Sequence, residues 1–252
     1  MITNISAVVL AKNNEATIKN TLDSLLEFED VVVYDNGSSD DTLNIVKSFA
    51  NANIIQGEFN GFGWTKNKAA EYAKNEWIII VDSDEVVDKE LLQTLKTKRF
   101  DKNTVYILNF KAFYKDRQVK YCGWNDQKIK RVYNKSITKY NDNHVHENIV
   151  TDGLKVESLE GNMEHYSYQS VEQFVAKANA YSTLFAKNNA GKKSSSPVKA
   201  FFNGAYSFIR TYFFKRGFLD GYVGLVISFS HMVTNFYKYI KLYELNEELK
   251  RR

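Results

Sequence analysis

Three apolar runs near the start of the chain constrain its fold more than any other feature. They are ISAVVLA at residues 5–11, DVVVYD at 30–35 and WIIIVD at 77–82. A continuous β-branched run is typical of a strand that is buried on both faces, as in a parallel sheet. Segments with a helical spacing of apolar residues separate these runs, and NIIQ at 53–56 is predicted as another strand. This alternation predicts a doubly wound α/β sheet, which binds ligands at the carboxyl ends of its strands.

The rest of the chain has a different pattern. Three short segments in the middle are aromatic and predict a small antiparallel addition to the sheet: 104–114, 118–124 and 128–134. From Ser170 onward the pattern is helical, with a break at GKKSSSPVK, residues 191–199. We therefore predict an α/β domain over residues 1–168 and a helical C-terminal region over residues 169–252.

Composition and charge narrow the class of protein. The chain has 252 residues, and 44% of them are hydrophobic, which suffices for a folded core. The formal net charge is only +4, so we predict no binding to nucleic acid. Cys122 is the single cysteine, which fits a reducing compartment. The N-terminal sequence has no basic leader and only a short apolar run, so the protein is predicted to be cytoplasmic.

A cluster of acidic residues follows the third apolar run. The sequence DSDE at residues 82–85 brings like charges together where the chain leaves the predicted sheet. A divalent cation would make this tolerable, because Mg²⁺ or Mn²⁺ prefers carboxylate oxygens and completes its shell with water and phosphate oxygens. Asp82 and Asp84 are the predicted ligands. The alternative is that these acids only cap the helix that DKELLQTL predicts.

Polar residues also follow the first two strands and open the next helix. Asp35 ends the second apolar run, where a carboxylate can accept hydrogen bonds from a base or a ribose hydroxyl. The segment AKNNE, residues 11–15, supplies further polar groups after the first strand. Lys66 and Asn67 lie near a helix start, where phosphate can be held. Helix caps and solvated lysines explain each feature singly, but together they predict a pocket for a nucleoside diphosphate and a metal ion.

Several of these segments together resemble one enzyme family. In their order and approximate spacing, AVVLAKNNEATI, VVVYDNGSSDDT and GWTKNKAAEYAKNEWIIIVDSDE resemble the inverting family 2 glycosyltransferases of the GT-A fold. GWNDQKIKRVYN and NHVHENI resemble, within that family, the bacterial lipopolysaccharide inner-core β-1,4-glucosyltransferases. The resemblance implies a Rossmann-like, mostly parallel GT-A sheet. It also implies transfer of a hexose from a UDP-sugar, with UDP-glucose as the donor and a lipopolysaccharide core heptose as the acceptor.

The resemblance further implies roles for residues of the donor site. Asp35 would contact the uracil. Three residues would line the same nucleotide end: Ala11, Asn13 and Glu15. Asp82 would approach the ribose or the metal ion, Asp84 would be the main metal ligand, and Ser83 lies between them in the same site.

Basic residues would act on the diphosphate, whose negative charge grows as it leaves. Lys66 and Asn67 stand where the family often has Arg-Asn, so the lysine departs from the commoner residue. His146 would complete the metal shell or donate to the phosphates, and Arg131 would share that work. The alternative for HVHE, residues 144–147, is two histidines that alternate on a strand, one of them satisfied by a backbone carbonyl.

An inverting transfer also needs a base that takes the proton of the acceptor hydroxyl. The family usually places this base in a Glu-Asp dipeptide some residues before an Arg. Asn125-Asp126 precedes Arg131 in this sequence, without the first acid of the dipeptide. Asp126 is therefore the predicted base, and Glu147 is the alternative.

The C-terminal region is basic and aromatic. Between Pro197 and Tyr243 it has six Lys or Arg residues and one acid, Asp220. Residues 199–218 mix Phe and Tyr with basic side chains, a composition that suits the headgroup zone of an anionic membrane. This predicts peripheral association with the inner face of the cytoplasmic membrane. The long helix that follows carries an apolar stripe that begins at Tyr222, which predicts packing against the catalytic domain or a homodimer.

Two other functions use similar features. A nucleotidyltransferase also needs paired carboxylates, but it usually has a glycine-rich loop after the first strand, and AKNNEAT contains no glycine. A catalytically silent glycolipid-binding scaffold could retain the same fold. Metal-dependent binding of UDP would distinguish a transferase from such a scaffold.

Overall fold

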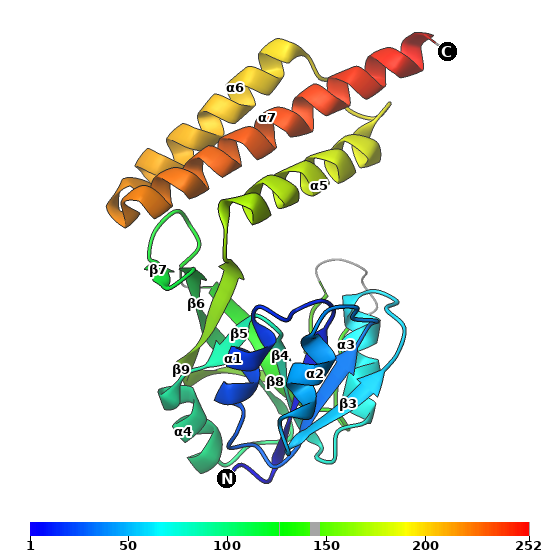
Figure 1. The fold of residues 1–252 in the computed structure, drawn as a ribbon, viewed down its shortest axis with the longest axis vertical. Coiled ribbons are helices and arrows are strands. Elements are labelled where there is room, and N and C mark those ends of the chain that lie inside the picture. Colours follow the sequence, from blue (N-terminus) through cyan, green and yellow to red (C-terminus); the bar gives the residue numbers. More distant parts are fainter. Residues whose placement is uncertain (126, 142–146, 252) are drawn as a thin grey trace. The chain divides into compact units, whose positions relative to one another are not determined.

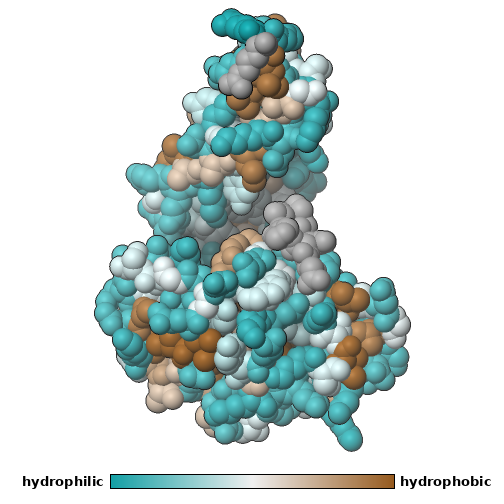
Figure 2. All heavy atoms as spheres, turned by 90° about the vertical axis from the view of Figure 1, so that its right-hand side faces the viewer, coloured by the Kyte–Doolittle hydropathy of each residue, from teal (hydrophilic) through white to brown (hydrophobic). Residues whose placement is uncertain are grey.

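The protein is seen in a computed structural model that describes residues 1–125, 127–141 and 147–251. It forms two compact units (Figure 1). Unit 1 consists of Met1–Lys111 and Asp126–Tyr166, and unit 2 consists of Ala112–Asn125 and Ser167–Arg252. Most of the visible surface is hydrophilic, with apolar side chains gathered in smaller patches (Figure 2).

Unit 1 is built around a sheet whose strands alternate with helices in the first half of the chain. The described strands are β1 (Ile5–Ala11), β2 (Val31–Asp35), β3 (Ala52–Gln56), β4 (Trp77–Asp82), β5 (Glu85–Val87), β6 (Thr104–Tyr114), β7 (Arg117–Val119), β8 (Gln127–Asn134) and β9 (Lys155–Tyr168). The helices of this half are α1 (Ile18–Ser24), α2 (Thr42–Lys47), α3 (Phe62–Glu71) and α4 (Lys89–Thr97).

The strand order is β3-β2-β1-β4-β8-β6-β9-β5, with β7 paired to β6. The pairs β1–β2, β1–β4 and β2–β3 are parallel. The pairs β4–β8, β6–β8, β6–β7 and β5–β9 are antiparallel. The predicted fold class is therefore confirmed: a Rossmann-like α/β sheet with a parallel half and an antiparallel addition, followed by a helical C-terminal region.

The antiparallel part is larger than predicted, because β5 and β9 join it. The predicted strand over 118–124 is wrong, since β7 ends at Val119. Cys122 and Gly123 have φ angles of 62° and 77°, and this left-handed backbone cannot continue a strand.

Helices cover both faces of the parallel strands, which explains the continuous apolar runs. Successive side chains of a strand point to opposite faces. In β1, Ala7 and Val9 belong to the cluster that includes side chains of α1, α2 and α4. Val8 and Leu10 belong to a second cluster, which includes Ala69 and its neighbours on α3.

Unit 2 is mainly helical. Its elements are α5 (Val171–Asn189), α6 (Pro197–Ile209), the π-helical turn η1 (Arg210–Phe214), the 3₁₀ turn η2 (Gly217–Asp220) and α7 (Tyr222–Arg251). Ser170 caps α5 by accepting a hydrogen bond from the Gln173 N–H, as the capping-box spacing predicts. Ser196 caps α6, with Pro197 in its first turn, so the predicted helix break is confirmed.

The apolar stripe predicted on α7, which runs from Tyr222 through Val226 and Phe229 to Tyr243, is only partly buried. Tyr222 and Phe229 are about half exposed, whereas Val223 and Ile227 beside the stripe are buried. The reason is that α7 contacts α5 and also α6, so apolar residues are needed on more than one side of it. At Gly204 of α6, an added Cβ would lie 3.1 Å from the Met232 carbonyl oxygen, which shows how closely α6 and α7 approach.

Gly161 allows β9 to pass the start of α4, and this contact gives a test of the fold. Its φ is +90°, and an added Cβ would lie 2.1 Å from the Leu91 backbone nitrogen. Gly161→Ala should therefore lower the free energy of unfolding by about 2–4 kcal/mol, from backbone strain and overpacking together. Gly153→Ala is the matched control, because Gly153 has a φ of +74° with nothing within 4 Å of an added Cβ. Urea unfolding of both variants measures the difference, and equal losses would contradict this account of the contact.

Candidate active site

The parallel register places the predicted site residues at one edge of the sheet. Ala11 at the end of β1 lies opposite Asp35 at the end of β2. Leu10 on β1 lies opposite Asp82 at the end of β4. The carboxyl ends of three neighbouring strands thus present the first acid of the DSDE cluster beside the two predicted nucleotide-binding loops.

The loops after β1 and β2 hold each other in place. The Asn13 N–H donates to Ser38 Oγ at 2.9 Å, and the Ser39 N–H donates to Asn13 Oδ1 at 2.8 Å. The Asp41 N–H donates to Glu15 Oε2 at 3.0 Å. Asn13 has a φ of 54°, a conformation that Asn adopts more readily than most residues. Asn13 and Glu15 therefore shape this edge of the sheet through their own side chains.

Asp35 has a structural role at the end of β2. It is fully buried, and its carboxylate accepts hydrogen bonds from the Gly37 N–H and from both the N–H and the hydroxyl of Ser38. These bonds close the turn that follows the strand. The next residue, Asn36, is only partly buried and donates its Nδ2 to the Gly57 carbonyl. Asn36 is thus a further polar residue at the same edge of the sheet. It was not among the predicted site residues, although its position directly after the second apolar run was a signal for it.

A buried arginine neutralises the acidic cluster. One terminal nitrogen of Arg131 on β8 donates to Asp82 Oδ2 at 2.7 Å and to Glu85 Oε1 at 2.6 Å. Lys66 Nζ lies 3.7 Å from Asp82 Oδ1, and the Asp82 N–H donates to Glu85 Oε2 at 2.8 Å. Much of the positive charge that the acids need therefore comes from the chain itself. Arg131 contacts the carboxylates of Asp82 and Glu85 and thereby positions them.

These contacts shift the ionisation of the cluster. Burial disfavours the charge of Asp82, but Arg131 and Lys66 outweigh it and hold the pKa of this carboxyl well below its usual range. Burial, opposed by Arg131 and reinforced by the charge of Asp82, raises the pKa of Glu85 to about 7. The two acids share one arginine, so ionisation of Asp82 is favoured at the expense of Glu85.

Asp84 differs from its neighbours in its partner. Its carboxylate is partly exposed, and Asp84 Oδ2 lies 3.4 Å from Nε2 of His165 on β9. Burial opposes protonation of His165, but the hydrogen bond and charge of Asp84 outweigh it and raise the pKa of this imidazole. No local sequence pattern marks His165, because only the pairing of β5 with β9 brings it to the cluster.

The donors at this corner fit a hard divalent cation with an open shell. Carboxylate oxygens and an imidazole are suitable ligands for Mn²⁺, and carboxylate oxygens for Mg²⁺. Within the described ranges, no group of three His, Cys, Asp or Glu side chains could enclose a metal ion. A cation here would therefore take part of its shell from water and phosphate, as Mg²⁺ commonly does. The alternative helix-capping role belongs to Asp88, which accepts a hydrogen bond from the Leu91 N–H at the start of α4.

Lys66 and Asn67 hold a neighbouring segment. Lys66 is only 4% exposed, and its Nζ lies 2.7 Å from Glu147 Oε1. Asn67 donates to the Tyr140 carbonyl and accepts from the Tyr140 N–H, both at 2.9 Å. Glu147, the alternative base, is thus one partner of an ion pair beside the acidic cluster. The predicted base Asp126 and the predicted metal ligand His146 lie outside the described residues.

Comparison with known proteins identifies the family. The model of glycosyl transferase family 2 matches residues 6–157. An uncharacterized glycosyltransferase of Rickettsia typhi is 30% identical over 96% of this chain and 87% of its own length. The lipopolysaccharide core biosynthesis glycosyltransferase LpsC of Rhizobium meliloti is 25% identical over 89% of each chain. Among solved structures, S. aureus TarS in complex with UDP-GlcNAc aligns with a TM-score of 0.45 and 16% identity, over 98% of this chain and 92% of that one.

The family that the sequence motifs resemble is therefore confirmed. The family model covers more than half of the chain, and the relatives match nearly all of it. This chain belongs to glycosyl transferase family 2 and is a glycosyltransferase.

Proposed function

We propose that this glycosyltransferase transfers a hexose, which we take to be glucose, from a UDP-sugar to a heptose of a lipopolysaccharide core. The transfer inverts the configuration at the anomeric carbon. One observation carries the donor half of this proposal: a partly exposed Asp84 beside an Asp82 that Arg131 and Lys66 keep ionised. The similarity to LpsC over 89% of both chains supports the acceptor half.

The donor would bind at the carboxyl edge of β1, β2 and β4. Asp84 and Asp82, with Ser83 between them and His165 alongside, would hold Mg²⁺ or Mn²⁺ there. The ion would supply positive charge to the diphosphate as it leaves. The nucleotide end would lie against the loops that contain Ala11, Asn13, Glu15 and Asp35, and Asn36 adds a further polar group to contact the base.

In the transfer step the acceptor oxygen forms a bond to the anomeric carbon while the bond from that carbon to the UDP oxygen breaks on the opposite face. The proton of the acceptor hydroxyl passes to a carboxylate. We assign this role to Asp126, with Glu147 as the alternative. The Glu147 carboxylate is already engaged in an ion pair with Lys66, which is why it is the alternative.

The helical unit would hold the enzyme at the inner face of the cytoplasmic membrane. No helix within the described ranges combines the length and apolarity that crossing a membrane requires. Exposed apolar side chains recur at helical spacing through α6 and into η1: Val198, Phe201, Phe202, Tyr206, Ile209 and Phe213. Arg210 and Arg216 are exposed in the same segment. An apolar face with cations beside it suits the headgroup zone of an anionic leaflet, where a glycolipid acceptor would be presented.

Asp84→Ala tests the donor site. It should weaken Mn²⁺-dependent binding of UDP ~10- to 100-fold, because it removes the main protein ligand of the ion. Isothermal titration with UDP, with and without MnCl₂, measures the effect, and Asp23→Ala on the surface of α1 is the control. UDP binding that is indifferent to metal in the unaltered protein would contradict the proposed metal site.

Asp126→Asn tests the base. The turnover number should fall about 10²- to 10⁴-fold while the affinity for UDP-glucose stays nearly unchanged, because the change removes proton acceptance and little shape. Transfer of radiolabelled glucose to a core glycolipid measures turnover. Glu147→Gln is the comparison, and a larger loss in that variant would move the role of base to Glu147.

Paired substitution of Phe213 and Phe214 tests the membrane face. Both rings are more than half exposed, so Phe213→Ser with Phe214→Ser should leave the melting temperature unchanged. Binding to vesicles of phosphatidylcholine and phosphatidylglycerol should fall at least ~10-fold, because two apolar anchors are lost. Flotation measures binding, and Leu26→Ser, at an exposed position in unit 1, is the control. Unchanged flotation of the double variant would remove α6 and η1 from the membrane contact.

A further inference from the structure

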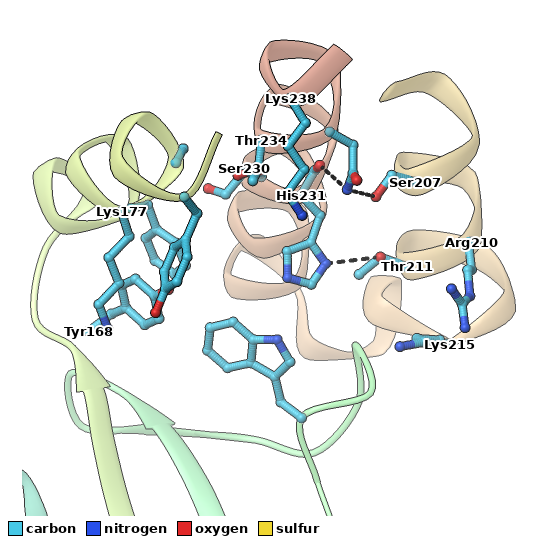
Figure 3. A pocket seen from close by; sticks show the side chains of 15 residues that line it. Tyr168, Lys177, Ser207, Arg210, Thr211, Lys215, Ser230, His231, Thr234 and Lys238 are labelled. Atoms are coloured by element: carbon cyan, nitrogen blue, oxygen red, sulfur yellow. Dashed lines mark hydrogen bonds between the residues drawn. The ribbon is translucent and has the colours of Figure 1, made fainter. Parts of the chain in front are cut away.

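A second polar pocket lies entirely within unit 2, apart from the residues assigned to the donor site. Its volume is about 350 Å³, and side chains of α5, α6, η1 and α7 line it together with Trp124 and Tyr168 (Figure 3). Four of the lining side chains are cationic: Lys177, Arg210, Lys215 and Lys238. No Asp or Glu is among the described residues that line it. Among the residues that the structure describes, the pocket therefore concentrates positive charge with no carboxylate to balance it.

Three of these cations also form no ion pair with any other described residue. Of the ion pairs in the described part of the chain, none involves Arg210, Lys215 or Lys238. Lys238 lies over the ring of Phe185, with Nζ 5.6 Å from the ring centroid. Lysine and arginine side chains that converge without an acid repel one another, so a bound anion would stabilise them.

Neutral hydrogen-bonding groups occupy the centre of the pocket. His231 on α7 points into it, and its Nδ1 lies 3.2 Å from the hydroxyl of the buried Thr211 (Figure 3). Burial lowers the pKa of His231 to about 4, and the charges of Lys215 and Lys238 add to the effect. The imidazole is thus neutral near pH 7, where it can exchange hydrogen bonds with a hydroxyl group.

Aromatic rings form another wall. The rings of Trp124 and Tyr168 stack at 5.4 Å between centroids, and Tyr168 stacks on Phe174 at 3.9 Å. Phe174 and the Lys177 ammonium, whose Nζ lies 4.1 Å from the ring centroid, already pack on Tyr168, so Trp124 is the ring of this wall left to meet the C–H groups of a sugar ring. The pocket thus combines an anion site with a surface suited to a saccharide.

We propose that this pocket binds a phosphomonoester carried on a saccharide or a similar ring of hydroxyl groups. A phosphomonoester carries about −1.5 to −2 charges near pH 7 and three acceptor oxygens, which match ammonium and guanidinium donors. The ring would lie against Trp124, and its hydroxyls would meet His231 and Thr211. The proposal does not depend on the donor, the acceptor or the base assigned above.

The test is direct binding to the full-length protein, with two sources of the same chemistry. Glucose 6-phosphate is the soluble probe, and glucose is its uncharged control. Phosphatidylcholine vesicles that contain phosphatidylinositol 4-phosphate are the lipid-linked probe, and phosphatidylcholine vesicles with phosphatidylglycerol at the same total charge are their control. Lys215→Gln and Lys238→Gln each remove one cation from the pocket. Lys187→Gln removes one from an exposed position on α5 outside it.

Each pocket variant should bind ~10-fold more weakly to whichever probe the unaltered protein binds, because one charge-assisted hydrogen bond is lost. Lys187→Gln should bind as the unaltered protein does, and unchanged melting temperatures would show that all variants fold. Binding to glucose 6-phosphate would identify a free sugar phosphate as sufficient, and binding only to the phosphoinositide vesicles would identify a lipid-linked one. Absence of binding to both probes, or binding that the Lys215→Gln/Lys238→Gln double variant retains in full, would overturn the proposal. Asp84→Ala should leave this binding intact, so failure here is distinct from failure at the donor site.

Discussion

The acidic cluster at the carboxyl edge of the sheet depends on the charge of Arg131. The side chain is buried on the central antiparallel strand β8 and contacts Asp82 and Glu85 at once. Removing one partner of such a buried pair typically costs about 3–5 kcal/mol, because the remaining charge is left uncompensated. The arginine therefore fixes the end of β4, and Asp84 is the acid of the cluster that lies outside this contact. Arg131 thus neutralises part of the negative charge of the cluster, and the negative charge that remains suits a bound cation.

Patterns of apolar residues predicted the parallel half of the sheet because burial on both faces leaves a strong signal. The antiparallel half of the sheet was harder to predict from the sequence. β5 has only three residues, too few for any periodicity to be visible. β9 has 14 residues, but its first part is exposed and polar, so it lacks the continuous apolar run that marks a buried strand. The buried residues of α7 are not confined to the predicted stripe, since a helix with neighbours on two sides has no single apolar face.

The residue types of the proposed donor site were readable from the sequence, but the partners of those residues were not. The DSDE cluster indicated a need for positive charge, yet Arg131 lies 49 residues from Asp82 in the chain and only the β4–β8 pairing brings them together. His165 reaches Asp84 through another long-range pairing. Asp35 is a different case: DNGSS is a local turn sequence in which an Asp can accept hydrogen bonds from the residues that follow it. The local turn thus accounts for the hydrogen bonds that the Asp35 carboxylate accepts. The prediction of a uracil contact did not consider this role in the turn.

The alternation of side chains along β1 has a consequence for how the sequence can vary. Residues at odd positions face one layer of helices and those at even positions face α3. Inserting one residue within β1 would turn every later side chain of the strand to the opposite face of the sheet. Each of these side chains would then meet packing that fits a different residue. Variation in length should therefore be excluded from the central strands and concentrated in the surface connections. Length conservation, rather than identity of any one apolar residue, is the constraint that this architecture places on its evolution.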